Sequence, residues 1–291
     1  MAWTVAGAFA EFENTIMPTA AQSGSIQPKI NTAHGYLQRA FPATSNMPLS
    51  RTVLIGSATQ GTLIRPVDDI DMMAVFDDSQ DIYENSYQGN SQAFIQRVRY
   101  AFNTCKIETV GVRGQAVRLF YKSGASVDIA PVFRWNYGGY ILPAGDNSWI
   151  RTDPDVQAQW FTAQDQRLSY HLLPMIRLLK RWNNEHGKQL KSYHLGVIVA
   201  HTFGSLGSNR ADAIAKFFVW AQNHIDVFDP AGYSGNLSSY LTVLTRLNLT
   251  SRLASAAARA NNAIAAELRG DNREAIRLWR IEFGNEFPAY G

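Results

Sequence analysis

Residues 51–57 read RTVLIGS, and after eleven further residues the chain reads DIDM at residues 69–72. The first run is apolar and β-branched until its final glycine and serine, which predicts a strand that ends in a turn. Residues 70–76 predict a second strand. Because side chains alternate along a strand, Asp69 and Asp71 are expected on the same face. The stretch thus predicts two neighbouring carboxylates close to a Gly-Ser turn.

Paired carboxylates of this kind require a cation between them, because two ionised carboxyl groups side by side repel each other. Mg²⁺ is a hard cation that such oxygens hold. Gly56 would let the backbone approach a phosphate closely, and N–H groups of the turn at Ser57 could line that phosphate. A phosphate cradle beside a metal pair predicts activation of a nucleoside triphosphate.

A third acidic residue lies within residues 126–131, which read SVDIAP. Val127 and Ile129 are expected to face the core, so that Asp128 faces the opposite side. Three carboxylates suit two-metal phosphoryl chemistry, in which the ions lie about 3.5–4 Å apart. Asp128 could then accept the proton of an attacking hydroxyl. An Asp-x-Asp pair alone is mostly a solvated pair on an exposed sheet face; the turn and the third carboxylate favour the functional interpretation.

Composition limits the class of protein. The chain has 291 residues, 46% of them hydrophobic and 18% charged, with a net charge of +3. This charge is too small to indicate nucleic-acid or membrane binding by its field alone. Its one cysteine, Cys105, excludes an internal disulfide framework and a Cys-rich zinc site. No apolar run approaches the ~20 residues that a membrane helix needs. Glu11 and Glu13 would interrupt the apolar core of a signal peptide, so we expect a cytoplasmic protein.

Two lobes are expected from the order of the patterns. Strands predicted near 107–110, 116–121 and 126–133 follow a helix at 91–104, and the glycine- and proline-rich interval 134–160 suggests the crossing. Amphipathic helices follow, near residues 163–186 (with Pro174 starting or kinking a helix), 192–206, 210–225, 236–268 and 271–284. The fold class is therefore α+β, with a catalytic lobe at 1–150 and a helical lobe at 151–291.

The motif Gly56-Ser57-x₁₁-Asp69-Ile70-Asp71 resembles the signature of the polymerase β-like nucleotidyltransferase superfamily. In the second half, LLKRW at 178–182 and KSYHL at 191–195 resemble motifs of cyclic GMP-AMP synthase, oligoadenylate synthase and their bacterial relatives. The bacterial CD-NTases are most similar, through TLIRP at 62–66 and WRIEFG at 279–284. The resemblance spans roughly residues 30–290 and implies a mixed-sheet nucleotidyltransferase lobe packed on a helical lobe, with the site in the cleft between them.

The resemblance also implies roles for single residues. Asp69 and Asp71 would hold two Mg²⁺ or Mn²⁺ ions and Asp128 one of them. The residues expected to bind nucleotide are Gly56, Ser57, Arg65, Lys180, Ser192 and Tyr193.

Each of these residues also has a plainer interpretation. Arg65 and Lys180 could be solvated surface residues, Ser192 could cap a helix, and Tyr193 could be core packing rather than a platform for a base. His194 is interpreted as structural.

The implied function is the joining of NTPs into a cyclic di- or trinucleotide second messenger for bacterial anti-phage (CBASS) signalling, with release of pyrophosphate. A linear oligonucleotide or RNA-tailing enzyme is one alternative, but we find neither an RNA-binding domain nor a strongly basic tract. A catalytically inactive nucleotide sensor is another, and it would predict a missing carboxylate, whereas all three are present.

Partners other than NTPs are weakly indicated. A nucleic-acid activator is not indicated, because the Cys/His zinc insertion of the animal synthase has no counterpart. Four arginines form one face of the last helices, namely Arg269, Arg273, Arg277 and Arg280, and a solvated face is the simpler interpretation. The last residues, 285–291, predict a short mobile tail. By resemblance to some CD-NTase systems, an E1/E2-like partner could conjugate Gly291.

Overall fold

The computed structural model describes residues 1–103, 107 and 109–291. Two compact units make up the chain, and each is described separately. A sheet unit contains residues 18–61 and 66–158, and a helical unit contains residues 1–17, 62–65 and 159–291. Cys105 and part of the strand expected at 107–110 lie outside the described residues.

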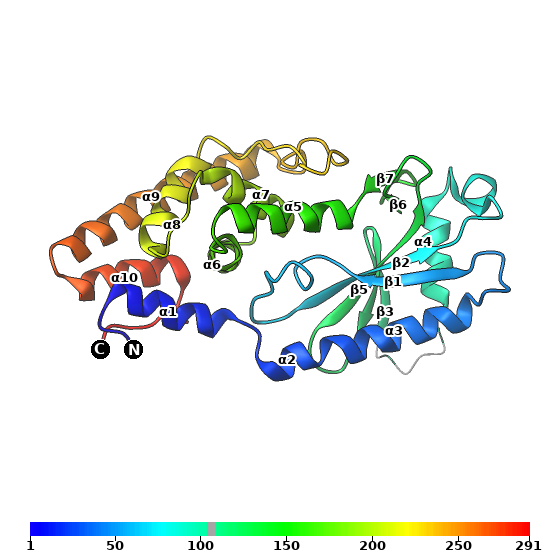
Figure 1. The fold of residues 1–291 in the computed structure, drawn as a ribbon, viewed down its shortest axis with the longest axis horizontal. Helices are drawn as coiled ribbons and strands as arrows, with labels where there is room; N and C mark the ends of the chain where they lie inside the picture. Colours follow the sequence, from blue (N-terminus) through cyan, green and yellow to red (C-terminus); the bar gives the residue numbers. More distant parts are fainter. Residues whose placement is uncertain (104–106, 108) are drawn as a thin grey trace. The chain divides into compact units, whose positions relative to one another are not determined.

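The sheet unit is a mixed sheet with helices on one face (Figure 1). Its strands are β1 (Leu49–Leu54), β2 (Asp69–Phe76), β3 (Thr109–Arg113), β4 (Ala116–Phe120), β5 (Ser126–Arg134), β6 (Tyr140–Pro143) and β7 (Trp149–Thr152). The order is β1-β2-β5-β4-β3, with β6 paired to β5 and β7 to β6. Strands β2 and β5 are parallel, and the other pairs are antiparallel. The predicted α+β class with a mixed sheet is confirmed.

One face of this sheet is apolar because alternate residues of the central strands point to it. Met72, Val127 and Ile129 are fully buried there. They pack against α3 (Ile26–Ala40) and α4 (Ser91–Tyr100) in one core. A short helix α2 (Ala20–Gly24) and a π-helix η1 (Tyr83–Tyr87) complete the unit. On the opposite face, Met73, Val75 and Val132 form a smaller apolar cluster, and polar side chains lie nearer the start of β2 and β5.

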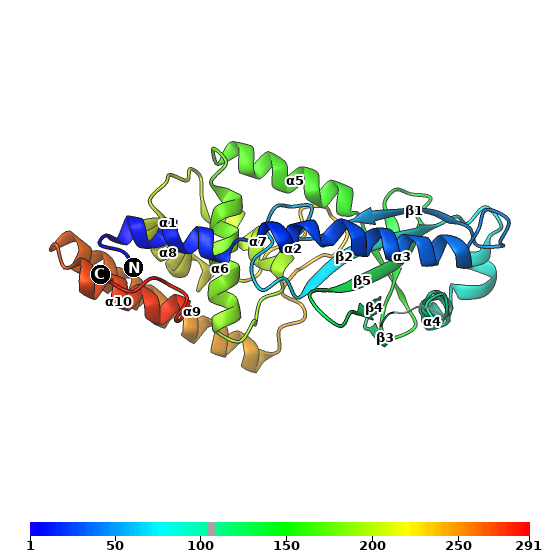
Figure 2. The same ribbon diagram turned by 90° about the horizontal axis from the view of Figure 1, so that it is seen from below.

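The helical unit, whose helices are seen from below in Figure 2, has a core of its own. Its helices are α1 (Val5–Ile16), α5 (Pro154–Arg167), α6 (Leu172–Glu185), α7 (Ser192–Thr202), α8 (Arg210–Ala221), α9 (Val243–Leu268) and α10 (Asn272–Phe283), and the boundary between the units falls inside α5. None of the helices that the structure describes is long and apolar enough to cross a membrane.

The division of the chain differs from the predicted lobes at 1–150 and 151–291, because the N-terminal helix belongs to the helical unit. Phe9 and Phe12 of α1 pack against Phe283 and Phe287 with ring centroids 5.1–5.8 Å apart. Residues 62–65 belong to the same unit, and Ile64 lies in its core. Contacts so distant in sequence leave no local signal.

Two further boundaries differ from the prediction. The interval 134–160, which was expected to cross between the lobes, contains strands β6 and β7. Gly138 and Gly139 take positive φ values of 92° and 71° and so close the hairpin turn between β5 and β6. The helix predicted at 163–186 is two helices, as Pro174 suggested. It breaks at 168–171, and Asp165 accepts hydrogen bonds from the backbone N–H groups of Leu172 (3.0 Å) and Leu173 (3.2 Å) at the start of α6.

The C-terminal residues are not the mobile tail that the sequence predicted. Ala2 pairs with Tyr290 in a parallel bridge, and the N–H of Ala2 donates to the carbonyl of Ala289 at 2.9 Å. Phe287 is 1% exposed. The tail is held because its aromatic side chain fills a position in the core, which outweighs the lack of an anchor at Gly291.

Candidate active site

The three predicted carboxylates lie on two neighbouring strands. In the parallel pairing of β2 with β5, Asp71 is in register with Asp128, and Asp69 is two residues earlier on β2. The flanking Ile70, Val127 and Ile129 are buried on the helix-covered face, so alternation directs the three aspartates to the other face. The sheet thus brings Asp128 next to a pair of acids that precede it by 57 and 59 residues in the chain.

The Gly-Ser turn lies directly against this group. Gly56 has φ of 69°, and a Cβ atom at this position would come within 2.6 Å of Asp71 Oδ2. Both facts require glycine, since other residues adopt this conformation at a cost and no real Cβ atom fits. The N–H of Gln60 and the hydroxyl of Thr59 donate to the Gly56 carbonyl and close the turn that contains Ser57. This steric reason for glycine adds to the predicted approach of a phosphate.

An arginine that the sequence analysis did not single out completes the group. Arg118 on β4 is in register with Asp128 on β5. Its Nε donates to Asp128 Oδ1 at 2.5 Å, its Nη2 donates to Asp128 Oδ2, and Nη2 lies 3.4 Å from Asp69 Oδ2. The hydrogen bonds with Asp128 raise the pKa of Arg118. A charged residue between Val117 and Leu119 in a predicted strand was the available signal, because alternation puts it on the acidic face.

The donor set fits a hard divalent cation. Carboxylate oxygens are ligands that Mg²⁺ and Mn²⁺ prefer. The guanidinium of Arg118, which contacts Asp69 and Asp128, is a positive charge that these carboxylates already bind. Over the described ranges, no three His, Cys, Asp or Glu side chains are arranged to hold a metal ion as they stand. Both oxygens of Asp128 are engaged by Arg118, so a cation held by Asp128 would have to displace part of this contact.

Two predicted nucleotide residues make contacts within the helical unit. Lys180 on α6 is 9% exposed, and its Nζ donates to the backbone carbonyl of Thr62 at 2.9 Å. The guanidinium of Arg65 donates to the carbonyl of Thr15 near the end of α1, and its N–H donates to Ile16. Neither residue is the solvated surface residue of the plainer interpretation. Both contacts hold residues 62–65 within the helical unit.

The other two predicted nucleotide residues lie at the start of α7. Ser192 is exposed and is the first helical residue, whereas Lys191 is the N-cap, so the plainer interpretation of Ser192 as a cap is wrong. Tyr193 is partly buried; its ring packs edge-on against Phe161, and its hydroxyl donates to Asp229 Oδ1 at 2.6 Å. Burial is the main cause that raises the pKa of Tyr193, and the hydrogen bond to Asp229 raises it further.

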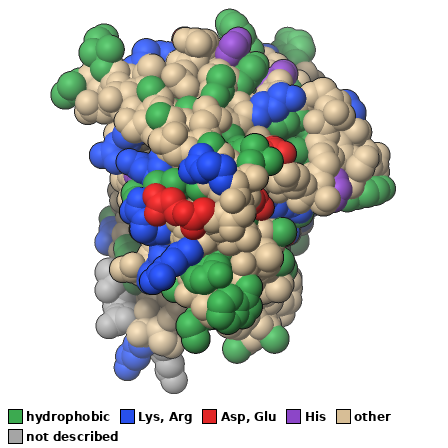
Figure 3. All heavy atoms as spheres, turned by 90° about the vertical axis from the view of Figure 1, so that its left-hand side faces the viewer, with side chains coloured by type: hydrophobic (Ala, Val, Ile, Leu, Met, Phe, Trp, Pro, Cys, Tyr) green, Lys and Arg blue, Asp and Glu red, His purple; other side chains and the backbone are tan. Residues whose placement is uncertain are grey.

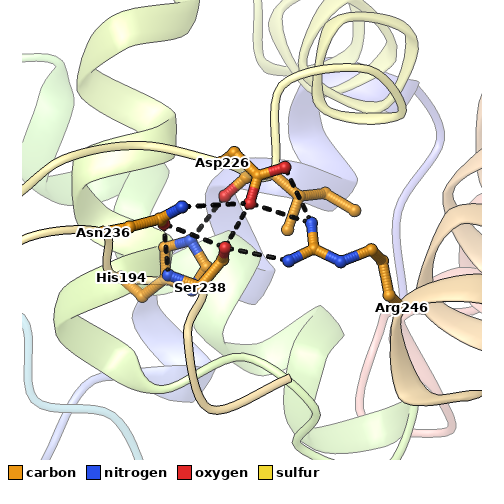
Figure 4. A network of polar contacts seen from close by, with 6 residues as sticks. His194, Asp226, Asn236, Ser238 and Arg246 are labelled. Atoms are coloured by element: carbon orange, nitrogen blue, oxygen red, sulfur yellow. Dashed lines mark hydrogen bonds and ion pairs between the residues drawn. The ribbon is translucent and has the colours of Figure 1, made fainter. Parts of the chain in front are cut away.

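A polar network beside Tyr193 orders the loop that follows α8 (Figure 4). His194 is 1% exposed and bonds the carbonyl of Ile225 at 2.7 Å and the hydroxyl of Tyr240 at 3.1 Å. Next to it, Asp226 accepts from Arg246 at 2.9 Å, and Ser238 joins both residues. Burial lowers the pKa of His194. The interpretation of His194 as structural is supported by these contacts.

The four-arginine face of the last helices is partly neutralised. Arg277 makes two hydrogen bonds to Glu274, at 2.6 and 2.7 Å. Figure 3 views the end of the helical unit that carries the chain termini, and acidic side chains there lie among Lys and Arg side chains. These contacts are those of a solvated face.

Comparisons with known proteins agree with this geometry. The family model described as "Second Messenger Oligonucleotide or Dinucleotide Synthetase domain" (SMODS) matches residues 3–165. A probable cyclic nucleotide synthase of Bacillus cereus is 26% identical, with 96% of each chain covered. The cyclic AMP-AMP-AMP synthase of Escherichia coli is 24% identical, with 88% of each chain covered.

Solved structures share the fold. The structure of Escherichia coli CdnC with ATP matches with a TM-score of 0.77 at 19% identity, covering 97% of this chain and 98% of that one. The Vibrio cholerae cyclic AMP-GMP synthase DncV matches with a TM-score of 0.67 at 15% identity, covering 97% and 86%. With the family model spanning more than half of its residues, this chain belongs to the SMODS family and is a bacterial CD-NTase, a nucleotidyltransferase of the polymerase β-like fold.

Proposed function

We propose that this protein is a metal-dependent synthase that joins NTPs into a cyclic oligonucleotide and releases pyrophosphate. The observation that carries the proposal is the row of Asp71 and Asp128 in register on parallel strands, with Asp69 on the same face and the Gly56-Ser57 turn against Asp71. Membership of the SMODS family and the cyclic nucleotide synthases among its relatives support the same conclusion.

The candidate site residues of the sheet unit have separate roles in this reaction. The turn at Gly56 and Ser57 positions the donor triphosphate through backbone N–H groups and a hydroxyl. Asp69, Asp71 and Asp128 would hold the divalent cations, which when bound neutralise triphosphate charge and favour ionisation of the attacking hydroxyl. Asp128 would accept the proton of that hydroxyl on a carboxylate oxygen that Arg118 releases. A 3′- or 2′-oxygen then forms the new phosphodiester bond as the bond to pyrophosphate breaks.

Residues of the helical unit would bind the nucleotides. Ser192 is exposed at the start of α7, where backbone N–H groups lack helical partners and favour an anion. Lys180 would have to exchange the Thr62 carbonyl for a phosphate oxygen, and Arg65 would have to leave Thr15. Tyr193 would offer the part of its ring that Phe161 does not cover. Of these contacts, the one from Ser192 requires the least rearrangement.

The product is proposed to be a cyclic di- or trinucleotide that signals in CBASS anti-phage defence, in the cytoplasm. Relatives are named cyclic AMP-AMP-AMP synthase and CBASS oligonucleotide cyclase CdnC. A solved CdnC is described in complex with HORMA, which supports a protein partner for this chain too. Conjugation of Gly291 by an E1/E2-like enzyme stays a proposal, and it would require the last residues to detach from Ala2.

The linear transferase and the inactive sensor are less well supported. All three carboxylates are present on one face, contrary to a sensor that has lost its metal ligands. Among the relatives named above are two cyclic nucleotide synthases.

The experiment is incubation of the purified chain with all four labelled NTPs and Mg²⁺ or Mn²⁺. Phosphatase-resistant products, resolved by mass, would establish cyclisation, base composition and ring size together. Asp71→Asn is the matched control and should give none. Products that phosphatase degrades completely would favour the linear transferase, and no NTP consumption under either metal would contradict the proposal.

A further inference from the structure

Arg118 stands in one row with two of the carboxylates. Antiparallel pairing puts Arg118 of β4 opposite Asp128 of β5, and parallel pairing puts Asp128 beside Asp71 of β2. Residues in register on adjacent strands point to the same face. The side chain of Arg118 is only 12% exposed and that of Asp128 only 15%. The arginine is thus built into the sheet rather than swung in from a surface loop.

The guanidinium uses the atoms that a metal would need. Its two bonds engage both oxygens of Asp128, and Nη2 also lies 3.4 Å from Asp69 Oδ2. A planar guanidinium fork matches a carboxylate bidentately and is always charged. A divalent cation must therefore displace at least part of this contact, and it is also repelled by the arginine's charge.

We infer that Arg118 is a positioning residue that serves as an internal counter-cation of the carboxylate group: it holds Asp128 and Asp69 in place before metal binds and lowers the affinity for metal by competing with it. The inference rests on the proposed function, since it presumes that the three aspartates are metal ligands. It predicts that the site exchanges one cation for another, with Asp128 passing from the guanidinium to the ion.

The test compares Arg118→Gln with Arg134→Gln, a matched charge loss at the exposed end of β5. Two quantities are measured without nucleotide: Mn²⁺ affinity by electron paramagnetic resonance, and thermal unfolding with and without Mn²⁺. Arg118→Gln should melt lower than the native chain without metal, because the carboxylates lose their counter-cation. It should bind Mn²⁺ more tightly, on the order of tenfold, and gain more in melting temperature on adding Mn²⁺. Arg134→Gln should behave as the native chain in both.

Arg118→Lys covers the case in which the glutamine variant does not fold. Lysine keeps the charge but loses the bidentate fork, so its Mn²⁺ affinity should lie above that of the native chain. Unchanged or weaker Mn²⁺ binding in the variants that fold would overturn the counter-cation role.

Asp71→Asn separates this failure from that of the proposed function. If native Mn²⁺ binding is lost in Asp71→Asn but is unaffected by changes at Arg118, the counter-cation role is wrong and the metal site stands. The second outcome is that Asp71→Asn leaves Mn²⁺ binding unchanged, both in the native chain and in the Arg118 variants. The counter-cation role and the proposed metal site would then both be wrong.

Discussion

The acidic face of the sheet unit was predicted from strand alternation, whereas the nucleotide residues of α6 and α7 in the helical unit were predicted from a resemblance, and the two groups are held in place differently. The carboxylates lie where strand alternation puts them, in a register fixed by the backbone. Lys180, Arg65 and Tyr193 instead bond to Thr62, Thr15 and Asp229 of their own unit. Short side chains on a sheet are positioned by the backbone, whereas long side chains on helices find partners that only packing reveals.

The largest effect should come from the acidic face. Asp69→Asn, Asp71→Asn and Asp128→Asn should each slow NTP consumption on the order of 10³-fold or more, because several kcal/mol of charge stabilisation depend on the metal ligands. Asp68→Asn is the control, since Asp68 is adjacent but exposed, and it should keep native turnover. Turnover is measured as pyrophosphate release.

The stability of the folded chain should distinguish Asp128 from Asp71. Asp128→Asn should unfold at lower denaturant concentration than Asp71→Asn, because it weakens the bidentate partner of the poorly exposed Arg118. Equal stability of the two variants would show that the Arg118–Asp128 contact contributes little to the fold.

Gly56→Ala tests how closely the turn and the carboxylates fit. The new Cβ atom would meet Asp71 Oδ2 at 2.6 Å in a backbone conformation with φ of 69°, so it should displace the carboxylate as well as cost about 1–2 kcal/mol of strain. Gly114→Ala is the matched control, because φ is 58° there but nothing lies within 4 Å of a Cβ. Both variants should lose stability, and only Gly56→Ala should lose most NTP turnover. Equal turnover in the two would contradict the steric role.

Tyr193→Phe sharpens the comparison from the helical side. A residue that only stacks on a base would tolerate the change, but here the hydroxyl bonds a carboxylate, so unfolding should be easier by about 1.5–3 kcal/mol. Urea unfolding measures this, with Tyr170→Phe as the control because Tyr170 is 68% exposed. A change within about 0.5 kcal/mol would return Tyr193 to a stacking role alone.

The smallest effect is a pH dependence of the helical unit. Burial lowers the pKa of His194 and of His201 below the usual 6.5 of a histidine. Between the folded and unfolded values the unfolded chain binds more protons, so stability should fall as pH drops below about 6.5 and level off below the folded pKa. His194→Gln should flatten this slope in urea unfolding at several pH values. His224→Gln, at an exposed position, should keep it. A slope that His194→Gln leaves unchanged would assign the effect elsewhere.

The sequence by itself determined which strands carry the three aspartates. Alternation around Ile70, Val127 and Ile129 assigned the three aspartates to one face of the sheet. The Gly56-Ser57 pair marked the end of the first strand. Both signals could be used because they are local in the sequence. Pro174 also predicted that a helix starts close to it, as α6 does. Arg118 could have been found by the same alternation.

Only the tertiary structure decided which groups meet. The register of β2 with β5, the Arg118–Asp128 contact and the place of Gly56 against Asp71 join residues that no local pattern connects. The same is true of α1 on α10, of Phe287 in the core and of Lys180 on Thr62. The physical reason is that burial and hydrogen bonding reward whichever partners the folded chain brings together, while the sequence shows only the period and the residue type at each position.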